Sequence, residues 1–431
     1  MSSRRTLPDV TVMQIDDRLR AAGLPPLPRG IWLEIDVDAL ANNVRVVREM
    51  VGPRVEINAV VKADAYGHGL KSVGLAFESA GADRLCVASI DEALALREAG
   101  VKVPVLVLFS IPADQAALAA RNRVEIVAAD MATAAATLDA WREERAGKEL
   151  VVHIEIETGL TRAGVQPEEV PELMSQLQGA PGVRVAGMWT HLAMPEDEAV
   201  TSAQVQAFER AVALVRGAGL PVPPRHVAAT GGLLTGRAPV YEGVRIGLGL
   251  YGLLPHDLPM PVPEKGFADR LRPALALKAR SLRVERFPPG VAVSYGGRWR
   301  TERDSVIATL PVGYADAIPR AAPWGEALVR GQRVPLVGTV AMDAVMADVT
   351  DVPGVGQDDE FVLVGVQGGQ EIGTDELSRA RNTIPWEVAT GMSYRIPRVY
   401  HRASVLVGLR TLTSEHLVAA DGASTEGDRK R

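Results

Sequence analysis

Short apolar runs alternate with segments of helical periodicity through the first half of the chain and somewhat beyond it. Segments such as residues 91–99 and 203–217 have the helical spacing and separate most of the runs. The eight runs typical of buried strands lie at residues 55–61, 84–88, 104–108, 124–127, 151–156, 185–189, 225–228 and 244–247. Alternating strands and helices indicate a parallel sheet. Eight units over about 200 residues predict an α/β fold of the closed (β/α)8 barrel type rather than an open sheet.

Two short elements precede these runs. Residues 14–22 can form a helix, which the following prolines end. Residues 31–35 alternate weakly as a strand, and Asp36 can cap a helix after it. The apolar face of that helix would contain Leu40, Val44, Val47 and Val51.

After about residue 272 the pattern changes to long β runs joined by tight turns. Residues 274–287 form one such run, and residues 327–330 and 333–337 flank Gly331-Gln332 in the manner of a hairpin. A chain of 431 residues has a suitable length for two domains. The expected segments are an N-terminal extension (1–29), a (β/α)8 barrel domain (30–272), a mostly β C-terminal domain (273–410) and a disordered tail (411–431).

Composition and charge narrow the class of protein. The net charge is −6 with acids and bases interspersed, so no nucleic-acid-binding surface is expected. The single cysteine, Cys86, lies in an apolar run and predicts neither a disulfide framework nor a thiolate metal site. No stretch reaches the roughly 18 uncharged apolar residues of a membrane span. Asp9, Asp16 and Asp17 interrupt the apolar core that a secretion signal would need, so we expect a soluble cytoplasmic protein without metal.

The first candidate for chemistry is Lys62, which breaks an apolar run just before the turn-prone segment Asp64-Ala-Tyr-Gly-His-Gly69. A lysine at the mouth of a buried strand is partly desolvated, which lowers the pKa of its amine and makes it a nucleophile for an aldehyde. From position alone, a strand-capping lysine that reaches back to water is the commoner case.

A second motif, Gly247-Leu-Gly249-Leu-Tyr-Gly252, matches the dinucleotide-binding pattern GxGxxG. That pattern requires a helix directly after it, and Pro255 with the three prolines that follow by Pro263 excludes one. The glycines still leave backbone N–H groups open to an anion such as phosphate.

The ten residues 60–69, VVKADAYGHG, closely resemble the pyridoxal-phosphate lysine motif of alanine racemases, and further motifs match in order over about residues 30–410. The resemblance implies that Lys62 carries pyridoxal 5'-phosphate as an internal aldimine. It also implies a homodimer, in which the β domain of the partner subunit completes the site in the barrel. The residues implied to hold the phosphate are Tyr66, Thr230, Gly231, Gly247 and Leu248.

The resemblance assigns further roles. Arg245 would face the pyridine nitrogen, where it can only donate and so leaves the ring a weaker electron sink. His191 would pack beside the ring. Tyr295 would be the second catalytic base opposite Lys62, provided that cations such as Arg245 stabilise its phenolate. The residues implied near the substrate are Tyr314 and Arg320 in the corridor and Met342, whose main chain would contact the substrate carboxylate.

Three positions depart from the family pattern. Arg162 matches the arginine that binds the cofactor's phenolic oxygen and the substrate carboxylate, but Glu155 stands where many relatives have a carbamylated lysine that orients it. Trp386 stands where a tyrosine usually reaches the phosphate. Thr339 stands where a corridor arginine is common, which leaves the substrate range open.

The function expected from the resemblance is racemisation of a small-molecule amino acid, L-alanine to D-alanine and back, by a two-base mechanism. A racemase of another or broader set of amino acids is one alternative. A second is a pyridoxal-phosphate decarboxylase of similar architecture, which would need a catalytic cysteine in its β domain. A non-enzymatic carrier of the cofactor would be a single barrel without a counterpart of Tyr295.

Overall fold

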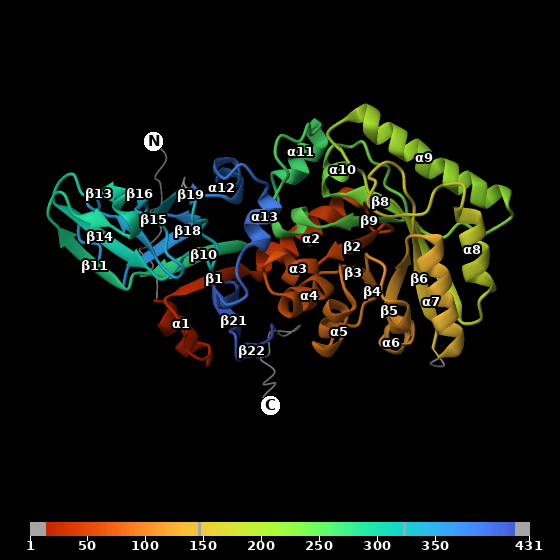
Figure 1. Ribbon diagram of the computed structural model, residues 1–431, viewed down its shortest axis with the longest axis horizontal. Coiled ribbons are helices and arrows are strands. Elements are labelled where there is room, and N and C mark those ends of the chain that lie inside the picture. The colour runs from red at the N-terminus through yellow and green to blue at the C-terminus, as the bar shows by residue number, and fades with distance from the viewer. Residues whose placement is uncertain (1–13, 145–147, 322–324, 419–431) are drawn as a thin grey trace, which may run out of the picture.

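The computed structural model describes residues 14–144, 148–321 and 325–418 (Figure 1). A closed barrel of eight parallel strands in chain order forms the right-hand part of Figure 1 within these ranges. Its strands are β2 (Glu56–Val60), β3 (Arg84–Val87), β4 (Val105–Val107), β5 (Val124–Ala128), β6 (Leu150–Glu155), β7 (Val183–Trp189), β8 (Arg225–Ala229) and β9 (Gly243–Ile246). Each of the eight predicted runs coincides with one strand to within two residues, which confirms the barrel. Because all strands are parallel, their carboxyl ends meet at one rim.

Helices surround the barrel and are placed by the periodicity of their apolar residues. The first follows Asp36, whose carboxylate accepts the Ala39 N–H at 3.0 Å and caps the helix as predicted. The helices and 3₁₀ turns of this part are α2 (Val37–Val51), α3 (Lys62–Tyr66), α4 (Leu70–Ser79), α5 (Ile90–Glu98), η1 (Ala113–Gln115), α6 (Ala116–Arg121), α7 (Met131–Glu143), α8 (Val170–Gly179), α9 (Glu198–Gly217), α10 (Thr230–Leu234), η2 (Leu248–Tyr251) and α11 (Val262–Ala268).

The second domain is built on a sheet with strand order β11-β14-β17-β16-β15-β18-β10-β1-β20-β21-β22, to which β19 adds beside β18. The expected hairpin is present: Val329 pairs with Gln332 across Arg330 and Gly331, whose φ angles of 50° and 74° suit a tight turn. The elements are β10 (Leu275–Arg280), β11 (Arg283–Phe287), β12 (Ala292–Val293), η3 (Tyr295–Gly297), β13 (Trp299–Arg300), β14 (Ser305–Leu310), β15 (Glu326–Val329), β16 (Gln332–Val337), β17 (Val345–Asp348), β18 (Glu360–Gln367), β19 (Gln370–Ile372), α12 (Thr374–Ala380), α13 (Pro385–Thr390), β20 (Arg398–Arg402), β21 (Val405–Arg410) and β22 (Glu415–His416).

Strand β1 (Ile31–Asp36) differs from the expected division of the chain. It lies in the sheet of the second domain, antiparallel to β10 and parallel to β20, although residues 30–272 were assigned to the barrel. A strand that is buried on both faces can pair in either sheet. The five buried residues of β1 therefore give no indication in the sequence of which sheet the strand joins. The chain therefore starts in the second sheet, builds the barrel and returns.

Both ends of the described chain pack on this second sheet. Helix α1 (Ile15–Ala21) occupies the predicted segment 14–22 and buries Ile15 and Leu19 against Trp32 and Leu409. At the other end, β22 pairs with β21, so the first part of the predicted disordered tail is ordered through residue 418. Residues 419–431 lie outside the described ranges.

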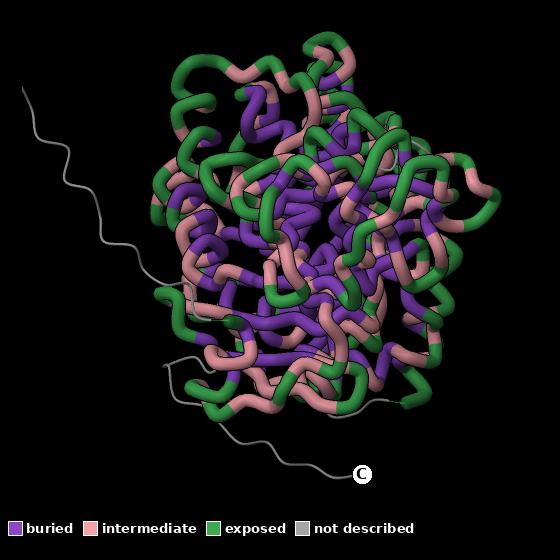
Figure 2. The backbone as a smooth tube through the Cα atoms, turned by 90° about the vertical axis from the view of Figure 1, so that its left-hand side faces the viewer, coloured by how far each residue is buried: buried purple, intermediate pink, exposed green. Residues whose placement is uncertain are grey.

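The interior is continuous between the two parts. Figure 2, seen from the side of the second domain, shows buried segments gathered in the middle and exposed segments in the outer loops. Cys86 is fully buried in β3, in agreement with its place in an apolar run. Within the described ranges, no helix combines the length and the apolar character needed to cross a membrane.

Candidate active site

Lys62 stands directly after β2, at the start of a one-turn left-handed segment. Ala63, Asp64, Ala65 and Tyr66 have φ angles of 52° to 55°, a conformation that costs each residue roughly 1–2 kcal/mol. Gly67 continues the turn at φ 79°, and a Cβ there would lie 2.3 Å from the Ala389 carbonyl oxygen. Strain of this kind persists only where neighbouring groups hold the chain in place.

A cavity of about 620 Å³ opens at the rim where the barrel strands end. Several of its residues lie within two positions after the end of a strand: Lys62 after β2, His191 after β7, Thr230 after β8 and Gly247 after β9. The second domain contributes to the same cavity through helix α13, which lies between the two parts in Figure 1. All ten residues expected to bind a cofactor line it, namely Lys62, Tyr66, Arg162, His191, Thr230, Gly231, Arg245, Gly247, Leu248 and Trp386.

Three cationic side chains share this cavity. The Lys62 ammonium and the Arg162 guanidinium lie 5.5 Å and 5.3 Å from the ring centre of Phe109. Burial lowers the pKa of Lys62, and the charges of Arg162 and Arg245 lower it further, against a smaller opposing effect of Glu92. The amine is therefore biased towards its neutral, nucleophilic form, and the cavity favours an anion.

Arg245 is held by neutral acceptors. Its Nη1 donates to Nδ1 of His226 at 3.0 Å and to the His226 carbonyl, and its Nη2 donates to the Thr190 carbonyl at 2.8 Å and to Nδ1 of His191 at 3.1 Å. These four bonds use four of the five guanidinium N–H donors, which leaves the Nε–H for a group in the cavity. Burial lowers the pKa of Arg245 to about 10, so the side chain is still charged at neutral pH.

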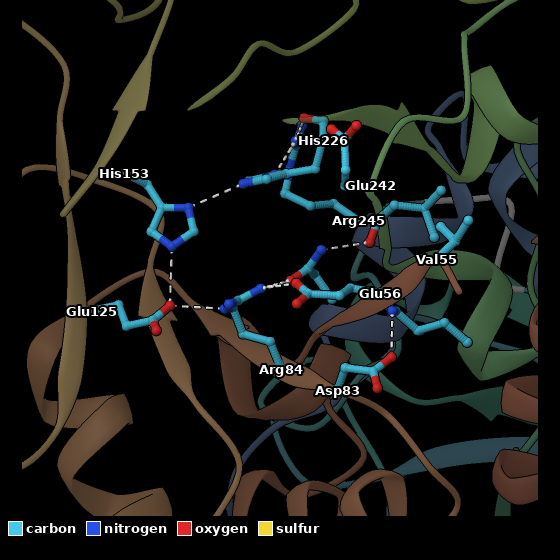
Figure 3. A network of polar contacts seen from close by, with 12 residues as sticks. Val55, Glu56, Asp83, Arg84, Glu125, His153, His226, Glu242 and Arg245 are labelled. Atoms are coloured by element: carbon cyan, nitrogen blue, oxygen red, sulfur yellow. Dashed lines mark hydrogen bonds and ion pairs between the residues drawn. The ribbon is translucent and has the colours of Figure 1, made fainter. Parts of the chain in front are cut away.

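A chain of buried polar groups continues from Arg245 into the barrel (Figure 3). Nε2 of His226 lies 3.1 Å from Nδ1 of His153, and Nε2 of His153 lies 3.0 Å from Oε2 of Glu125. Arg84 donates to the same carboxylate oxygen at 2.8 Å. Because an arginine can only donate, Nδ1 of His226 must accept, and both histidines are then neutral Nε2–H tautomers.

Four second-domain residues expected at the site lie elsewhere on this chain. Tyr295, Tyr314 and Met342 are 69%, 42% and 52% exposed, and Arg320 is exposed as well. Within the described residues, none of the four lines the cavity. Backbone bonds bring two of their loops together, because the Tyr314 N–H donates to the Ala341 carbonyl at 3.0 Å.

The chain matches two family models, the N-terminal domain of alanine racemase over residues 35–255 and its C-terminal domain over residues 274–400. The chain belongs to the alanine racemase family. It is 38% identical to an alanine racemase of Desulfovibrio desulfuricans over 383 residues, 86% of this chain and 98% of the relative. It is 37% identical to that of Synechocystis over 374 residues, 85% of this chain and 98% of the relative.

Solved structures of alanine racemases agree. The enzyme of Bacillus anthracis, crystallised with bound L-Ala-P, superposes with a TM-score of 0.83 at 32% identity and covers 90% of this chain and 99% of its own. That of Streptomyces lavendulae has a TM-score of 0.78 at 32% identity, with coverage of 87% and 98%. The chain is therefore an isomerase of this family, and the fold expected from the sequence is confirmed.

Of the three positions that depart from the racemase pattern, Glu155 is the one whose contacts the structure describes most directly. Its Oε1 accepts from Nη2 of Arg162 over a long 3.4 Å. Its Oε2 is buried without a partner among the described residues, and burial raises the pKa of the carboxyl despite the charge of Arg162. A carboxylate is thus present beside the arginine, with a weak hold on it.

Sequence reasoning missed several groups that shape the site. Phe109, one residue beyond a predicted strand, had no signal beyond being aromatic. His226 is a polar residue inside an apolar run, which is a signal that a buried partner exists. Glu92 joins two strand ends by accepting the Ala63 N–H at 2.7 Å and the Ala88 N–H at 2.8 Å, a bridge that only the folded chain reveals.

We predict that His153 and His226 are neutral Nε2–H tautomers at about pH 5.5, where an ordinary histidine with a pKa near 6.5 is mostly protonated. Burial lowers the pKa of both, so protonation begins only at lower pH. Nitrogen-15 NMR of protein labelled only at its seven histidines checks this, with His226→Asn assigning its signals. An Nδ1–H tautomer at His226 would contradict the hydrogen-bond order.

Proposed function

We propose that this chain interconverts L- and D-alanine with pyridoxal 5'-phosphate as its cofactor, and that Lys62 and Tyr295 are its two bases. The observation that carries the proposal is a lysine of lowered pKa at the barrel rim, in a cationic cavity lined by all ten expected cofactor residues. Loss of optical rotation from L-alanine in the presence of the purified protein tests the activity.

The residues present fit this cofactor. A Cβ at Gly247 would lie 2.5 Å from the Tyr66 hydroxyl, so only glycine lets the tyrosine and the backbone approach one another there. Thr230 already accepts the Gly249 N–H at 3.3 Å, and its hydroxyl hydrogen is available to a phosphate oxygen. Together with the amides of Gly231, Gly247 and Leu248 these groups form an anion cradle, which Trp386 can complete with its indole N–H.

Each remaining group has a defined task in the proposal. Bound to the amino acid, the cofactor withdraws electrons and acidifies the hydrogen on the α-carbon. Lys62 holds the cofactor and moves a proton on one face of that carbon. Arg245 would donate to the ring nitrogen and, as a permanent donor, keep it unprotonated, which would limit side reactions such as transamination. His191 packs beside the ring, and Arg162 binds the phenolic oxygen and the substrate carboxylate.

Racemisation needs a second base on the opposite face of the α-carbon. Tyr295 is two-thirds exposed and outside the cavity of its own chain, which supports a role in the site of a second copy. In a two-fold dimer each chain would complete its neighbour's site. Met342 would add its main chain to the substrate carboxylate, and Tyr314 and Arg320 would line the corridor.

A decarboxylase of similar architecture is disfavoured. That reaction in related architectures uses a cysteine of the β domain, whereas the single cysteine of this chain, Cys86, is buried in strand β3 of the barrel. Burial also raises the pKa of its thiol to about 12, so it is not a reactive thiolate. Release of carbon dioxide from any amino acid would reverse this assignment.

We predict that the cofactor is bonded to Lys62. The purified protein should be yellow, and borohydride should fix the cofactor permanently on the peptide that contains Lys62. Mass spectrometry of the digested protein checks the position. The nearby Lys71, which is paired with Glu98, is the matched comparison. Label on Lys71 or on any other lysine would overturn the assignment.

We predict that Glu155 makes the enzyme independent of bicarbonate, because its carboxylate is permanent. Glu155→Gln should weaken the orientation of Arg162 and raise the KM for alanine by about 2- to 12-fold, as expected when a hydrogen bond with a net worth of about 0.5–1.5 kcal/mol is lost. Glu157→Gln is the control on the same strand end. Strong activation of the wild type by bicarbonate, or equal effects of the two changes, would contradict this role.

We predict complementation between two inactive variants. Lys62→Ala and Tyr295→Phe homodimers should each be nearly inactive, because every site lacks one base. Unfolding them together and refolding them produces mixed dimers in which one site contains both bases, so part of the activity should return. Wild-type chains treated in the same way provide the reference. A mixture that stays inactive while the wild type recovers places Tyr295 in its own chain's site or in none.

A further inference from the structure

The left-handed turn after Lys62 is gripped by the second domain of the same chain. Arg410, at the end of β21, donates from Nη1 and Nη2 to the two carboxylate oxygens of Asp64 at 2.6 Å and 2.7 Å. The Arg410 side chain is 4% exposed, so this two-point ion pair is shielded from solvent on the arginine side. Bidentate arginine-carboxylate pairs fix direction as well as distance.

Two residues of the neighbouring strand β20 hold the carbonyls at the end of the turn. Arg398, fully buried, donates from Nε and Nη2 to the Gly67 carbonyl at 3.2 Å and 3.1 Å. Tyr400 donates to the His68 carbonyl at 3.1 Å. Because these bonds go to main-chain carbonyls, they hold the second domain against the turn without requiring the carboxylate of Asp64.

Asp64 itself links three parts of the chain. One of its oxygens also accepts the Leu70 N–H at 2.9 Å, which satisfies the first turn of α4. Its own backbone is in the left-handed conformation, two residues after Lys62. A carboxylate fixed at both oxygens therefore prevents the turn from relaxing towards the right-handed form, which would swing Lys62 away from the cavity.

We propose that Asp64 and Arg410 form a latch through which the second domain sets the position of Lys62, and that both are positioning residues for the cofactor-bearing amine. The inference rests on the proposed function of Lys62 for its consequence in the reaction. The mechanical part, a turn held left-handed by this pair, stands on the contacts alone. Neither residue lines the cavity, so an effect of either on cofactor release is transmitted through the turn.

The test compares Asp64→Asn, Arg410→Gln and Arg410→Lys in the full-length, cofactor-loaded protein. An asparagine keeps an oxygen for the Leu70 N–H but points an amide donor at Arg410, so it opens the latch without removing the cap of α4. Arg330→Gln is the matched control, because Arg330 makes a similar two-point pair with Asp359, at 2.8 Å and 3.0 Å, away from the turn.

Two measurements are read. Hydrogen exchange by mass spectrometry should show faster exchange at residues 63–69 in Asp64→Asn and Arg410→Gln. Cofactor release from these variants should be faster by about tenfold or more, which is the effect expected when one charge-assisted hydrogen bond is lost. Arg410→Lys, which keeps the charge but a single bond, should lie between these and the wild type. In the double variant the effects should add only in part, because the Asp64–Arg410 pair is removed twice, whereas the ion pair of Asp64 with Arg398 at 3.6 Å is lost through Asp64→Asn alone.

The proposal fails if the variants lose thermal stability as Arg330→Gln does while exchange at 63–69 and cofactor release stay at wild-type values. If Arg410→Gln does not fold, Arg410→Lys and Asp64→Asn decide by the same two measurements. If the wild-type chain does not bind pyridoxal phosphate at Lys62, the proposed function fails, and exchange at 63–69 in the cofactor-free variants still tests the latch.

Discussion

Repulsion among three cations that share one cavity is the constraint that organises the site. Lys62, Arg162 and Arg245 face one cavity at the barrel rim, and the structure provides little negative charge to balance them. Placing unpaired charges in a partly dry site is costly unless each finds acceptors or gives up its proton. The three cations meet this constraint in three different ways, and each way has a chemical consequence.

Lys62 reduces the repulsion by becoming less basic, because burial and its two cationic neighbours lower its pKa. Arg245 cannot lose its proton at neutral pH and is instead surrounded by neutral acceptors, two imidazole nitrogens and two carbonyls. Arg162 is partly exposed and has one weak carboxylate contact. The unbalanced positive potential makes the cavity selective for an anionic ligand, and the carboxylate of Glu125, neutralised by Arg84 deeper in the barrel, does not cancel it.

The order of strands and the gathering of site residues were readable from the sequence, because parallel strands leave each following residue at the same rim. Lys62, His191 and Thr230 each follow a predicted strand and Gly247 ends one, so their meeting was a consequence of the barrel. The match of the ten-residue motif at 60–69 then identified the family, which no pattern of apolar positions could do.

Other features could not be predicted, for physical reasons that differ. The left-handed turn is made by alanine, aspartate and tyrosine, residues that avoid φ > 0 unless distant groups impose it, so no local propensity announces it. The role of His226 depends on Arg245 and on His153, which lie on other strands. Strand β1 is buried on both faces and suits either sheet. The ordering of residues 411–418 depends on a partner strand rather than on composition.

The two domains are coupled in a way that limits how the site can work. Trp386 of α13 lines the cavity of its own chain, and the strands that follow α13 bind the turn after Lys62, so the second domain cannot swing away without disturbing that lysine. Tyr295, Tyr314 and Met342 of the same domain remain exposed outside this cavity. If they serve a second copy, each C-terminal domain touches two sites, one through a fixed internal contact and one through a surface. Opening for substrate must then occur between chains, because the interface within a chain is the one that holds the amine in place.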